Sequence, residues 1–429
     1  MAPRVPLAEV ISVGDELLQG WSVDTNAGEI ARALLDLGIR VGRFTSAPDD
    51  RALLASALLD SSKRAEFVII TGGLGPTEDD LTREAAADAA GVDLEFVPEL
   101  WEAVEARWRA RGAPAPPSNR RQAYRPRGAV TIPNGRGTAP GFSLRLGQAQ
   151  LFSLPGVPHE MRAMLSEWVM PHLAAAALQA DGYVRRVLKC FGASESSVGE
   201  RIARWMRRGA NPLVGITVSR GILTISVLAQ SEGVDPRSKQ QIAEATADEI
   251  AADLGSLVYA REDRTLEEVV AQRLLEKHVT VAFAESCTAG LATSLLASVP
   301  GISSSLLESW VVYSNRAKEL RLGVRREILE RHGAVSAECA ESLAQACRAA
   351  SGAHLAVSVT GIAGPGGGSA EKPVGTVWFA LASSSGTISW QRTLAGLDRN
   401  LIREIAAREA LNAFRLSVEG HDPRFRPAL

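Results

Sequence analysis

Two short apolar runs, each followed by a polar or glycine-rich turn, limit most strongly what this chain can fold into. Phe67–Thr71 leads into Gly-Gly-Leu-Gly, and Val279–Phe283 leads into Glu-Ser-Cys-Thr. Continuous apolar runs of this length are typical of strands buried on both faces of a parallel sheet. Helical patterns follow both turns, so the chain is predicted to alternate strands and helices as α/β proteins do.

The alternation extends over two long regions that enclose a shorter one of different character. We predict an α/β fold in which two domains of the doubly wound type, residues 1–172 and 264–420, flank a small α+β module at 183–260. The alanine-rich stretch Leu173–Asp181 marks the first boundary. In the first domain the expected strands are Ala8–Val13, Ile39–Phe44 and Phe67–Thr71, and the expected helices are Asn26–Leu37 and Arg51–Leu59.

The small module and the last domain are predicted from the same signals. The module is expected to contain, in order, strand Val184–Phe191, helix Ser196–Arg207, hairpin strands Val214–Ser219 and Ile222–Leu228, helix Lys239–Leu254 and a short strand near Val258. After the Val279–Phe283 strand, the last domain is expected to contain strands Trp310–Tyr313, His354–Thr360 and Val374–Ser383, and helices Leu266–Lys277, Ala334–Ala349 and Arg399–Phe414.

Composition excludes several classes of protein. The 429 residues have a formal net charge of −2, which provides no electrostatic attraction to nucleic acid or to a membrane surface. No apolar run reaches the roughly 18 residues that span a bilayer, and the four cysteines have no metal-binding spacing. We therefore expect a cytoplasmic protein with reduced thiols.

The turn after Val279–Phe283 is the first candidate site. Ser286 is expected at the carboxyl end of a strand, beside the free N–H groups of the helix that starts near Leu291. Such donors hold a phosphate or the oxyanion of an acyl-transfer intermediate. The alternative is that Ser286 or Thr288 only caps the helix.

The glycine-rich turn after Phe67–Thr71 is the second candidate site. Gly72, Gly73 and Gly75 allow close approach of a ligand, although the spacing matches neither a Walker A loop nor GxGxxG. Asp79 and Asp80 follow and are suited to a divalent cation that binds a phosphate-bearing ligand. Alternatively they are acids of a first helical turn, favoured by the helix dipole.

Taken together, the motifs resemble those of full-length bacterial CinA (competence/damage-inducible protein A) over nearly the whole chain. The matching segments are Gly14–Leu18, Asp24–Asn26, Thr71–Thr77, Asp79–Thr82, Gly137–Gly141, Pro155–Met161, Glu285–Thr288, Tyr313–Lys318, Gly333–Ser336, Thr360–Ser369 and Glu371–Trp378. One departure is Ala289, where the family commonly has glycine.

The resemblance implies three parts with separate roles. The first domain is similar to MoaB/Mog-like molybdopterin-binding proteins, which in this family are associated with metal-dependent ADP-ribose pyrophosphatase activity. The middle module is similar to a KH domain. The last domain is similar to nicotinamide mononucleotide (NMN) amidohydrolase, which releases ammonia and leaves nicotinic acid mononucleotide. Both activities serve recycling of the pyridine part of NAD.

The resemblance and the residue chemistry together assign roles at the amidohydrolase site. Ser286 is the predicted nucleophile, Lys318 the base and Tyr313 a proton relay or orienting hydroxyl. Cys287 is a rival nucleophile, and a solvated helix face for Lys318 or core packing for Tyr313 are the structural alternatives. Residues expected to bind the substrate are Glu285, Thr288, Thr360, Gly361, Gly364, Gly366, Arg399 and Arg403. This site is expected to need no cofactor.

The N-terminal site is expected to need a divalent metal ion of unknown identity. Asp15, Asp49, Asp79 and Asp80 are its predicted ligands, with Gly72, Gly73 and Gly75 against the phosphates. A different function is that of a non-catalytic nucleotide- or pterin-binding protein in competence or the DNA damage response. The GXXG loop of a nucleic-acid-binding KH domain is not evident at 183–260, so nucleic acid is not an expected partner. A homodimer is expected.

Overall fold

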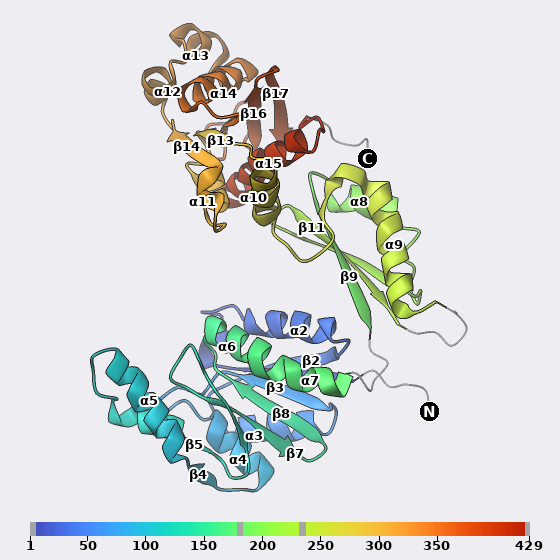
Figure 1. Cartoon of the computed structure of the whole chain (residues 1–429), viewed down its shortest axis with the longest axis vertical. Coiled ribbons are helices and arrows are strands. Elements are labelled where there is room, and N and C mark those ends of the chain that lie inside the picture. The colour runs from blue at the N-terminus through green and yellow to red at the C-terminus, as the bar shows by residue number, and fades with distance from the viewer. Residues whose placement is uncertain (1–5, 178–182, 231–236, 425–429) are drawn as a thin grey trace. The chain divides into compact units, whose positions relative to one another are not determined.

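The computed structural model describes residues 6–177, 183–230 and 237–424 (Figure 1). The chain divides into two compact units, Met1–Arg185 with Leu228–Ala243, and Arg186–Val227 with Glu244–Leu429. The boundary predicted at Leu173–Asp181 begins inside a helix that ends at Ala177, and its remainder lies outside the described residues.

A mixed sheet forms the centre of the N-terminal domain, and its strands follow the order β2-β1-β3-β8-β7-β6 among the described residues. β1, β2, β3 and β8 run parallel, whereas β7 and β6 are antiparallel to their neighbours. The strands are β1 Leu7–Val13, β2 Arg40–Ala47, β3 Phe67–Thr71, β6 Val130–Ile132, β7 Gly141–Leu146 and β8 Ala149–Leu154. β4 Leu94–Phe96 and β5 Tyr124–Pro126 form a separate antiparallel pair.

Helices cover both faces of this sheet, which explains the continuous apolar strands. In β1, Val10 packs on one face in a core with Ile30 of α2 and Met161 of α6, and Ile11 packs on the other with Leu54 of α3. The helices are α1 Asp15–Leu18, α2 Asn26–Asp36, α3 Arg51–Ser62, α4 Thr82–Ala90, α5 Pro98–Ala110, α6 Pro158–Met164 and α7 Met170–Ala177. The predicted strand Phe67–Thr71 is β3 without change.

The small module has the predicted element order, with one helix shorter than expected. Its sheet order is β10-β11-β9-β12, built from β9 Val184–Phe191, β10 Leu213–Ser219, β11 Ile222–Ala229 and β12 Val258–Ala260. The long helix is α9 Lys239–Leu254. Helix α8 is Glu195–Ile202, so the prediction that it continues to Arg207 was wrong. The Arg204–Arg208 stretch lies in the turns after the helix, and none of its residues is buried. The buried apolar residues Val198 and Ile202 both lie within α8.

The C-terminal domain is built on a second mixed sheet, with strand order β14-β13-β15-β16-β17. β13 is parallel to both β14 and β15, and β16 and β17 are antiparallel additions. The strands are β13 Val281–Glu285, β14 Leu306–Val311, β15 Leu355–Gly361, β16 Thr376–Ser383 and β17 Gly386–Thr393. The helices are α10 Leu266–Glu276, α11 Leu291–Ala297, α12 Asn315–Leu322, α13 Arg326–His332, α14 Ala337–Ser351 and α15 Arg399–Val418.

The strand predicted at Trp310–Tyr313 was wrong in its bounds. β14 starts at Leu306 and ends at Val311, where its partner β13 also ends, and Val312 N–H closes the pair on the Glu285 carbonyl. The start was missed because β14 is an edge strand whose sequence carries the polar residues Glu308 and Ser309, so it lacks a continuous apolar run. The strand-to-loop step at Val312 leaves Tyr313 just outside the sheet.

Candidate active site of the C-terminal domain and a second cavity

Ser286 lies directly after β13, as predicted, and is held at the sheet edge by its own backbone. Its N–H donates to the Val359 carbonyl on β15 at 2.9 Å, and its carbonyl accepts from Ala289 N–H at 3.1 Å. The side chain is 7% exposed. The tight turn therefore presents the hydroxyl group at the carboxyl ends of two central strands.

Glu285 caps helix α11, which corrects two expectations about this turn. Its carboxylate accepts from Ala292 N–H at 3.1 Å, from Thr293 N–H at 2.9 Å and from the Thr293 hydroxyl at 2.6 Å. The first-turn N–H groups are therefore occupied by a protein carboxylate rather than free for a ligand. Neither Ser286 nor Thr288 makes a capping hydrogen bond to the helix.

Lys318 lies against Ser286 and not on a solvated helix face. Its Nζ atom donates to Ser286 Oγ at 2.9 Å, to the Val312 carbonyl at 2.9 Å and to the Tyr313 carbonyl at 3.2 Å, and the side chain is 1% exposed. Burial lowers the pKa of this amine from its ordinary value of 10.5. A buried lysine with a lowered pKa is the form that can accept a proton near neutrality.

Helix α12 fixes the position of Lys318. Ser314 caps its start, with the hydroxyl accepting from Ala317 N–H at 3.1 Å, and Gly323 ends it in the left-handed conformation. Because Lys318 is on the first turn after this cap, the amine reaches back across the end of β14 to the Ser286 turn. The sequence motif Tyr313–Lys318 is thus one structural unit.

Cys287 is buried and is the weaker nucleophile of the two. Burial raises the pKa of its thiol to about 12, so the thiol stays protonated near neutral pH. Within the described part of the chain, the Lys318 amine donates to Ser286 and to two backbone carbonyls and not to the Cys287 thiol. The N–H groups of Cys287 and Thr288 have no backbone acceptor within the described part of the chain, which leaves them available as oxyanion donors.

Tyr313 is the predicted catalytic residue whose side chain lies apart from the Ser286–Lys318 pair. Tyr313 is 55% exposed, and its hydroxyl accepts from Arg399 Nη2 at 3.0 Å. Arg399 Nη1 also donates to the Gly364 carbonyl. Tyr313, Arg399 and Gly364 form a chain of contacts from α15 to the glycine-rich loop after β15. This chain meets the pair at the Tyr313 carbonyl, which accepts from Lys318 Nζ at 3.2 Å.

The other predicted substrate-binding residues contact the Ser286 turn or lie at the end of β15. Arg403 Nη2 donates to the Thr288 carbonyl at 3.0 Å, and the Thr360 hydroxyl donates to the Ala334 carbonyl at 2.7 Å. Thr288 is fully buried, and its hydroxyl has no partner among the described residues. At Gly361 a β-carbon would come within 2.9 Å of the Thr376 carbonyl oxygen, so only glycine fits.

Gly364 and Gly366 belong to the loop between β15 and β16, and they differ in what surrounds them. Gly364 has φ +78° and a β-carbon there would meet the Val374 side chain at 2.6 Å, whereas Gly366 faces open space. Ala289 occupies a left-handed conformation with φ 52°. The departure from glycine at this position therefore puts backbone strain into the Ser286 turn.

A cavity of about 390 Å³ lies at the carboxyl ends of the strands in the N-terminal domain. The predicted glycines Gly72, Gly73 and Gly75 all line it, and the carboxylates that line it are those of Glu16, Asp49, Asp79, Asp80 and Glu160. Of the predicted metal ligands, Asp15 alone is not in this lining. Its carboxylate accepts from Asp49 N–H at 3.3 Å, and Asp49 in return accepts from Asp15 N–H at 3.0 Å.

Asp80 organises the glycine loop. Its carboxylate accepts from Gly75 N–H at 2.7 Å, from Thr77 N–H at 2.8 Å and from the Thr77 hydroxyl. Arg83, which the sequence reading missed, is buried below the loop and donates to the Leu74 carbonyl at 2.6 Å. Burial lowers the pKa of Arg83 to about 10. The loop is thus held in place by side chains on α4 and just before it.

The carboxylates at this cavity have the chemistry of a cation site. Burial raises the pKa of Asp49, and the negative charges of Asp15, Asp79 and Glu16 raise it further. A cation would relieve that repulsion. Within the described residues, no group of three or more His, Cys, Asp or Glu side chains is placed to hold a metal ion. Mg²⁺ needs only one or two protein carboxylates when substrate phosphates supply other ligands, and Asp49 and Asp79 fit that requirement.

Two residues that were not predicted belong to this cavity. Glu160 lines it, and Asn134 holds the Glu160 carboxylate in place. Asn134 Nδ2 donates to Glu160 Oε2 at 2.6 Å, and Asn134 Oδ1 accepts from Gly137 N–H at 2.7 Å. A β-carbon at Gly137 would overlap the Glu160 carboxylate. The signal in the sequence was the pairing of two glycine- and proline-rich motifs, Gly137–Gly141 and Pro155–Met161, which were recognised separately but not as neighbours.

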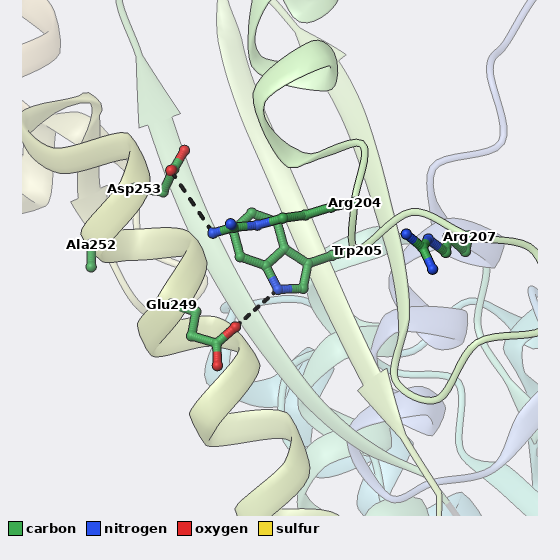
Figure 2. A pocket seen from close by; sticks show the side chains of 6 residues that line it. All are labelled: Arg204, Trp205, Arg207, Glu249, Ala252 and Asp253. Carbon is green, nitrogen blue, oxygen red and sulfur yellow. Dashed lines mark hydrogen bonds and ion pairs between the residues drawn. The ribbon is translucent and has the colours of Figure 1, made fainter.

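Another cavity, of about 730 Å³, lies in the small module where the basic stretch follows α8 (Figure 2). The Arg204 guanidinium stacks 3.9 Å from the Trp205 ring centroid, and Trp205 Nε1 donates to Glu249 at 3.1 Å. Asp253 lies 4.0 Å from the Arg204 guanidinium. Figure 2 shows the two acids on α9 facing the arginine and the tryptophan, so acids balance the positive charge at this cavity.

No helix in residues 6–177, 183–230 and 237–424 is long and apolar enough to cross a membrane. Models of three protein families match the chain: the probable molybdopterin binding domain over residues 9–175, the damage-inducible protein CinA KH domain over 185–260, and the CinA C-terminal domain over 263–418. These ranges account for the two α/β sheets and the small module between them.

Proteins with related sequences extend this result to nearly the full length. A CinA-like protein of Citrifermentans bemidjiense is 42% identical over 406 residues, which are 95% of this chain and 96% of that protein. A CinA-like protein of an Anaeromyxobacter species is 41% identical over 96% of this chain and 98% of its own length. A crystal structure of a competence/damage inducible protein from Agrobacterium tumefaciens is 36% identical, with a TM-score of 0.35, and covers 37% of this chain and 99% of that one. The chain therefore belongs to the CinA family.

Proposed function

We propose that the C-terminal domain hydrolyses a carboxamide, with Ser286 as the nucleophile and Lys318 as its base. The observation that carries this proposal is the hydrogen bond of 2.9 Å between Lys318 Nζ and Ser286 Oγ, made by a lysine that is 1% exposed. A hydroxyl paired with a buried amine, beside two unused backbone N–H groups, supplies the parts that acyl transfer needs.

The three acceptors around Lys318 control the direction of the key hydrogen bond. A charged ammonium has three N–H donors, which match Ser286 Oγ and the carbonyls of Val312 and Tyr313. The neutral amine has two N–H donors and one lone pair. Because a carbonyl can only accept, the two N–H groups stay on the carbonyls and the lone pair faces Ser286. Loss of one proton thus converts the hydroxyl group from acceptor to donor.

The reaction then follows in two halves. Ser286 Oγ attacks the carboxamide carbon while its proton passes to Lys318, and the oxyanion lies against the N–H groups of Cys287 and Thr288. The C–N bond breaks as Lys318 returns the proton to nitrogen, which leaves as ammonia. Water next attacks the acyl-serine ester with Lys318 again as base, so that the carboxylate product leaves and the Ser286 hydroxyl is restored.

The substrate we propose is NMN, which the domain would convert to nicotinic acid mononucleotide in the recycling of pyridine nucleotides. Supporting this choice, Arg399 and Arg403 bring two positive charges toward the glycine loop and the Ser286 turn. Such charges suit the single phosphate of a mononucleotide. In this arrangement Tyr313 acts on Arg399 and not on the reacting atoms.

Ammonia release from NMN by the full-length protein tests this proposal. Wild type and Cys287→Ala should both release ammonia, and Ser286→Ala should lose about 10⁴–10⁶-fold in rate while keeping its thermal unfolding curve. Loss in Cys287→Ala with retention in Ser286→Ala would assign the thiol instead. A folded wild type that releases no ammonia from NMN would remove the amidohydrolase proposal.

A second proposal concerns the N-terminal domain, where the cavity of about 390 Å³ combines the predicted Gly72, Gly73 and Gly75 with five carboxylates. We propose that it hydrolyses the pyrophosphate of ADP-ribose, with Gly72, Gly73 and Gly75 against the phosphates. A divalent ion held by Asp49 and Asp79 would neutralise phosphate charge and activate water. Asp80 and Arg83 keep the loop in the shape that the phosphates require.

Hydrolysis of ADP-ribose with and without added Mg²⁺ or Mn²⁺ tests this second activity. Asp49→Asn should abolish it, and Ser286→Ala should leave it unchanged because the two sites use different residues. If ADP-ribose binds but is never cleaved, the N-terminal domain is a nucleotide-binding module. That result would favour the alternative of a non-catalytic nucleotide- or pterin-binding protein.

A further inference from the structure

The hairpin turn between β10 and β11 of the small module lies against helix α15 of the C-terminal domain. All the residues concerned belong to one of the two compact units, which combines Arg186–Val227 with Glu244–Leu429. Arg220 and Gly221 are the two residues between the end of β10 and the start of β11. The turn belongs to neither candidate active site.

The backbone of this turn is strained at Arg220. Both turn residues have a positive φ, 50° at Arg220 and 79° at Gly221. A two-residue hairpin turn with positive φ at both positions is of type I′, which favours asparagine followed by glycine. A long side chain in this conformation is strained, and strained residues of this kind cluster at functional sites. The contacts of Arg220 therefore require an explanation.

The turn contacts α15 through a side chain, a carbonyl group and a close backbone approach. Arg220 Nη1 lies 3.5 Å from Glu404 Oε1, and the Arg220 carbonyl accepts from Arg408 Nη1 at 3.4 Å. A β-carbon at Gly221 would come within 2.9 Å of Ile405 Cγ1. These contacts fall on consecutive turns of the helix, so the hairpin turn holds α15 at more than one point.

The same part of α15 carries the two arginines of the amidohydrolase site. Arg403 directly precedes Glu404, and its Nη2 donates to the Thr288 carbonyl in the Ser286 turn at 3.0 Å. Arg399, one helical turn earlier, donates to the glycine-rich loop after β15. Backbone hydrogen bonds keep a helix rigid over this length. A displacement of α15 at Glu404 therefore moves both arginines.

The charges at this contact are balanced by the side chain from the hairpin turn. Arg408 lies 3.3 Å from a carboxylate oxygen of Glu267 on α10 and 3.6 Å from one of Glu404, and all three side chains are mostly shielded from solvent. Arg220 brings a second positive charge to Glu404. Two carboxylates are then matched by two guanidinium groups, which is the arrangement that shielded charges need.

We infer that Arg220 is a positioning residue of the amidohydrolase site, which acts through Glu404 to fix α15 where Arg399 and Arg403 can bind the phosphate of the substrate. The inference rests on the proposed action on NMN. It explains the strain, because the asparagine that the turn favours is too short to reach Glu404. The small module thereby contributes to substrate binding by the neighbouring domain without touching the substrate.

Steady-state ammonia release from NMN by the full-length protein tests this role with Arg220→Asn. This variant keeps a residue that suits the turn and removes the charge. The KM for NMN should rise about two- to fivefold, the range for one partly exposed ion pair, with kcat within about twofold of wild type. The thermal unfolding temperature should stay the same or rise, because asparagine relieves the strain. Arg220→Lys retains the charge and should restore a KM near that of wild type.

His278→Asn is the matched control, since His278 also has a left-handed backbone, with φ 53°, but lies between α10 and β13. It should relieve strain without changing KM. Glu404→Gln should raise KM as Arg220→Asn does, and the double variant should show no further increase, because the two residues act as one pair.

Three results would overturn the positioning role while the proposed deamidation stands. They are a wild-type KM in Arg220→Asn, a KM in Arg220→Lys as high as that of Arg220→Asn, and multiplying effects of Arg220→Asn and Glu404→Gln. A folded wild type that releases no ammonia from NMN would instead remove the proposed activity, and the positioning role with it.

Discussion

The Nζ atom of Lys318 donates to Ser286 Oγ at 2.9 Å, although 32 residues separate them in the sequence. The parallel pairing of β13 with β14 brings them together, because Ser286 follows one strand and the loop to α12 follows the other. Both side chains are nearly inaccessible, at 7% and 1% exposed. The protein, and not bulk water, therefore controls whether the pair is charged.

The rate of ammonia release should rise with pH, with a midpoint below 10.5. Burial lowers the pKa of Lys318 from that value, and only the neutral amine can take the Ser286 proton. The unfolded chain keeps this proton to higher pH, so the same group makes the folded state relatively more stable as pH rises toward 10.5. Measurement of kcat/KM from neutral to alkaline pH checks the first statement.

Lys318→Arg provides the control for that profile, because a guanidinium stays charged throughout. It should lose about 10²–10⁴-fold in rate, the usual contribution of a general base, and the remaining rate should not show the same midpoint. An unchanged profile in this variant would assign the titration to another group.

Tyr313→Phe should raise the KM for NMN about three- to tenfold and leave kcat within about twofold. The reason is that the hydroxyl it removes accepts from Arg399 and, within the described residues, makes no hydrogen bond to Ser286 or Lys318. Steady-state kinetics separate the two parameters. A fall in kcat at unchanged KM would instead support the proton relay expected from the sequence.

Glu285→Gln should lower the free energy of unfolding by about 1–3 kcal/mol. An amide group would place its N–H donors against the N–H groups of Ala292 or Thr293, where the carboxylate now accepts. Calorimetry of the full-length protein measures the change. The control is Glu308→Gln on the edge strand β14, where the side chain is exposed; its free energy of unfolding should stay within about 0.5 kcal/mol of wild type. Equal effects of the two variants would show that the hydrogen bonds from α11 to Glu285 do not stabilise the fold.

Ala289→Gly should stabilise the C-terminal domain by about 0.5–1 kcal/mol. Ala289 has φ 52°, a conformation that costs a side-chain-bearing residue about 1–2 kcal/mol, and the greater freedom of glycine in the unfolded chain offsets part of the gain. Ala349→Gly on helix α14 should have the opposite sign, because glycine is a poor helix former. Thermal unfolding distinguishes the two variants, and destabilisation by both would contradict the strain at Ala289.

Periodicity and motifs predicted the parts of this protein that depend on local sequence. The buried strand β3 was found to the residue, and Ser286 and Lys318 were identified from the motifs around them. The edge strand β14 was misplaced because the polar residues Glu308 and Ser309 interrupt its apolar run. A continuous apolar run in the sequence reveals a strand that is buried on both faces, and the edge strand β14 is not buried in this way.

Contacts between distant segments could not be read from the sequence. Glu285 was expected to bind substrate, but the strand-to-helix turn brings its carboxylate to Ala292 and Thr293. Asp80 was expected to bind a metal, and its oxygens instead accept from Gly75 and Thr77. In both cases the residue was recognised and its partner was not, because the partner depends on backbone geometry that a motif does not encode.

The closure of the glycine loop by Asp80 has a consequence for ligand binding. Because its carboxylate already fixes Gly75 and Thr77, the loop adopts its shape without a phosphate. Association then requires little further loss of chain entropy, so each contact to the phosphates contributes more of its energy to affinity. The loop behaves as a rigid receptor, and a ligand that does not match its shape cannot gain affinity by reshaping it.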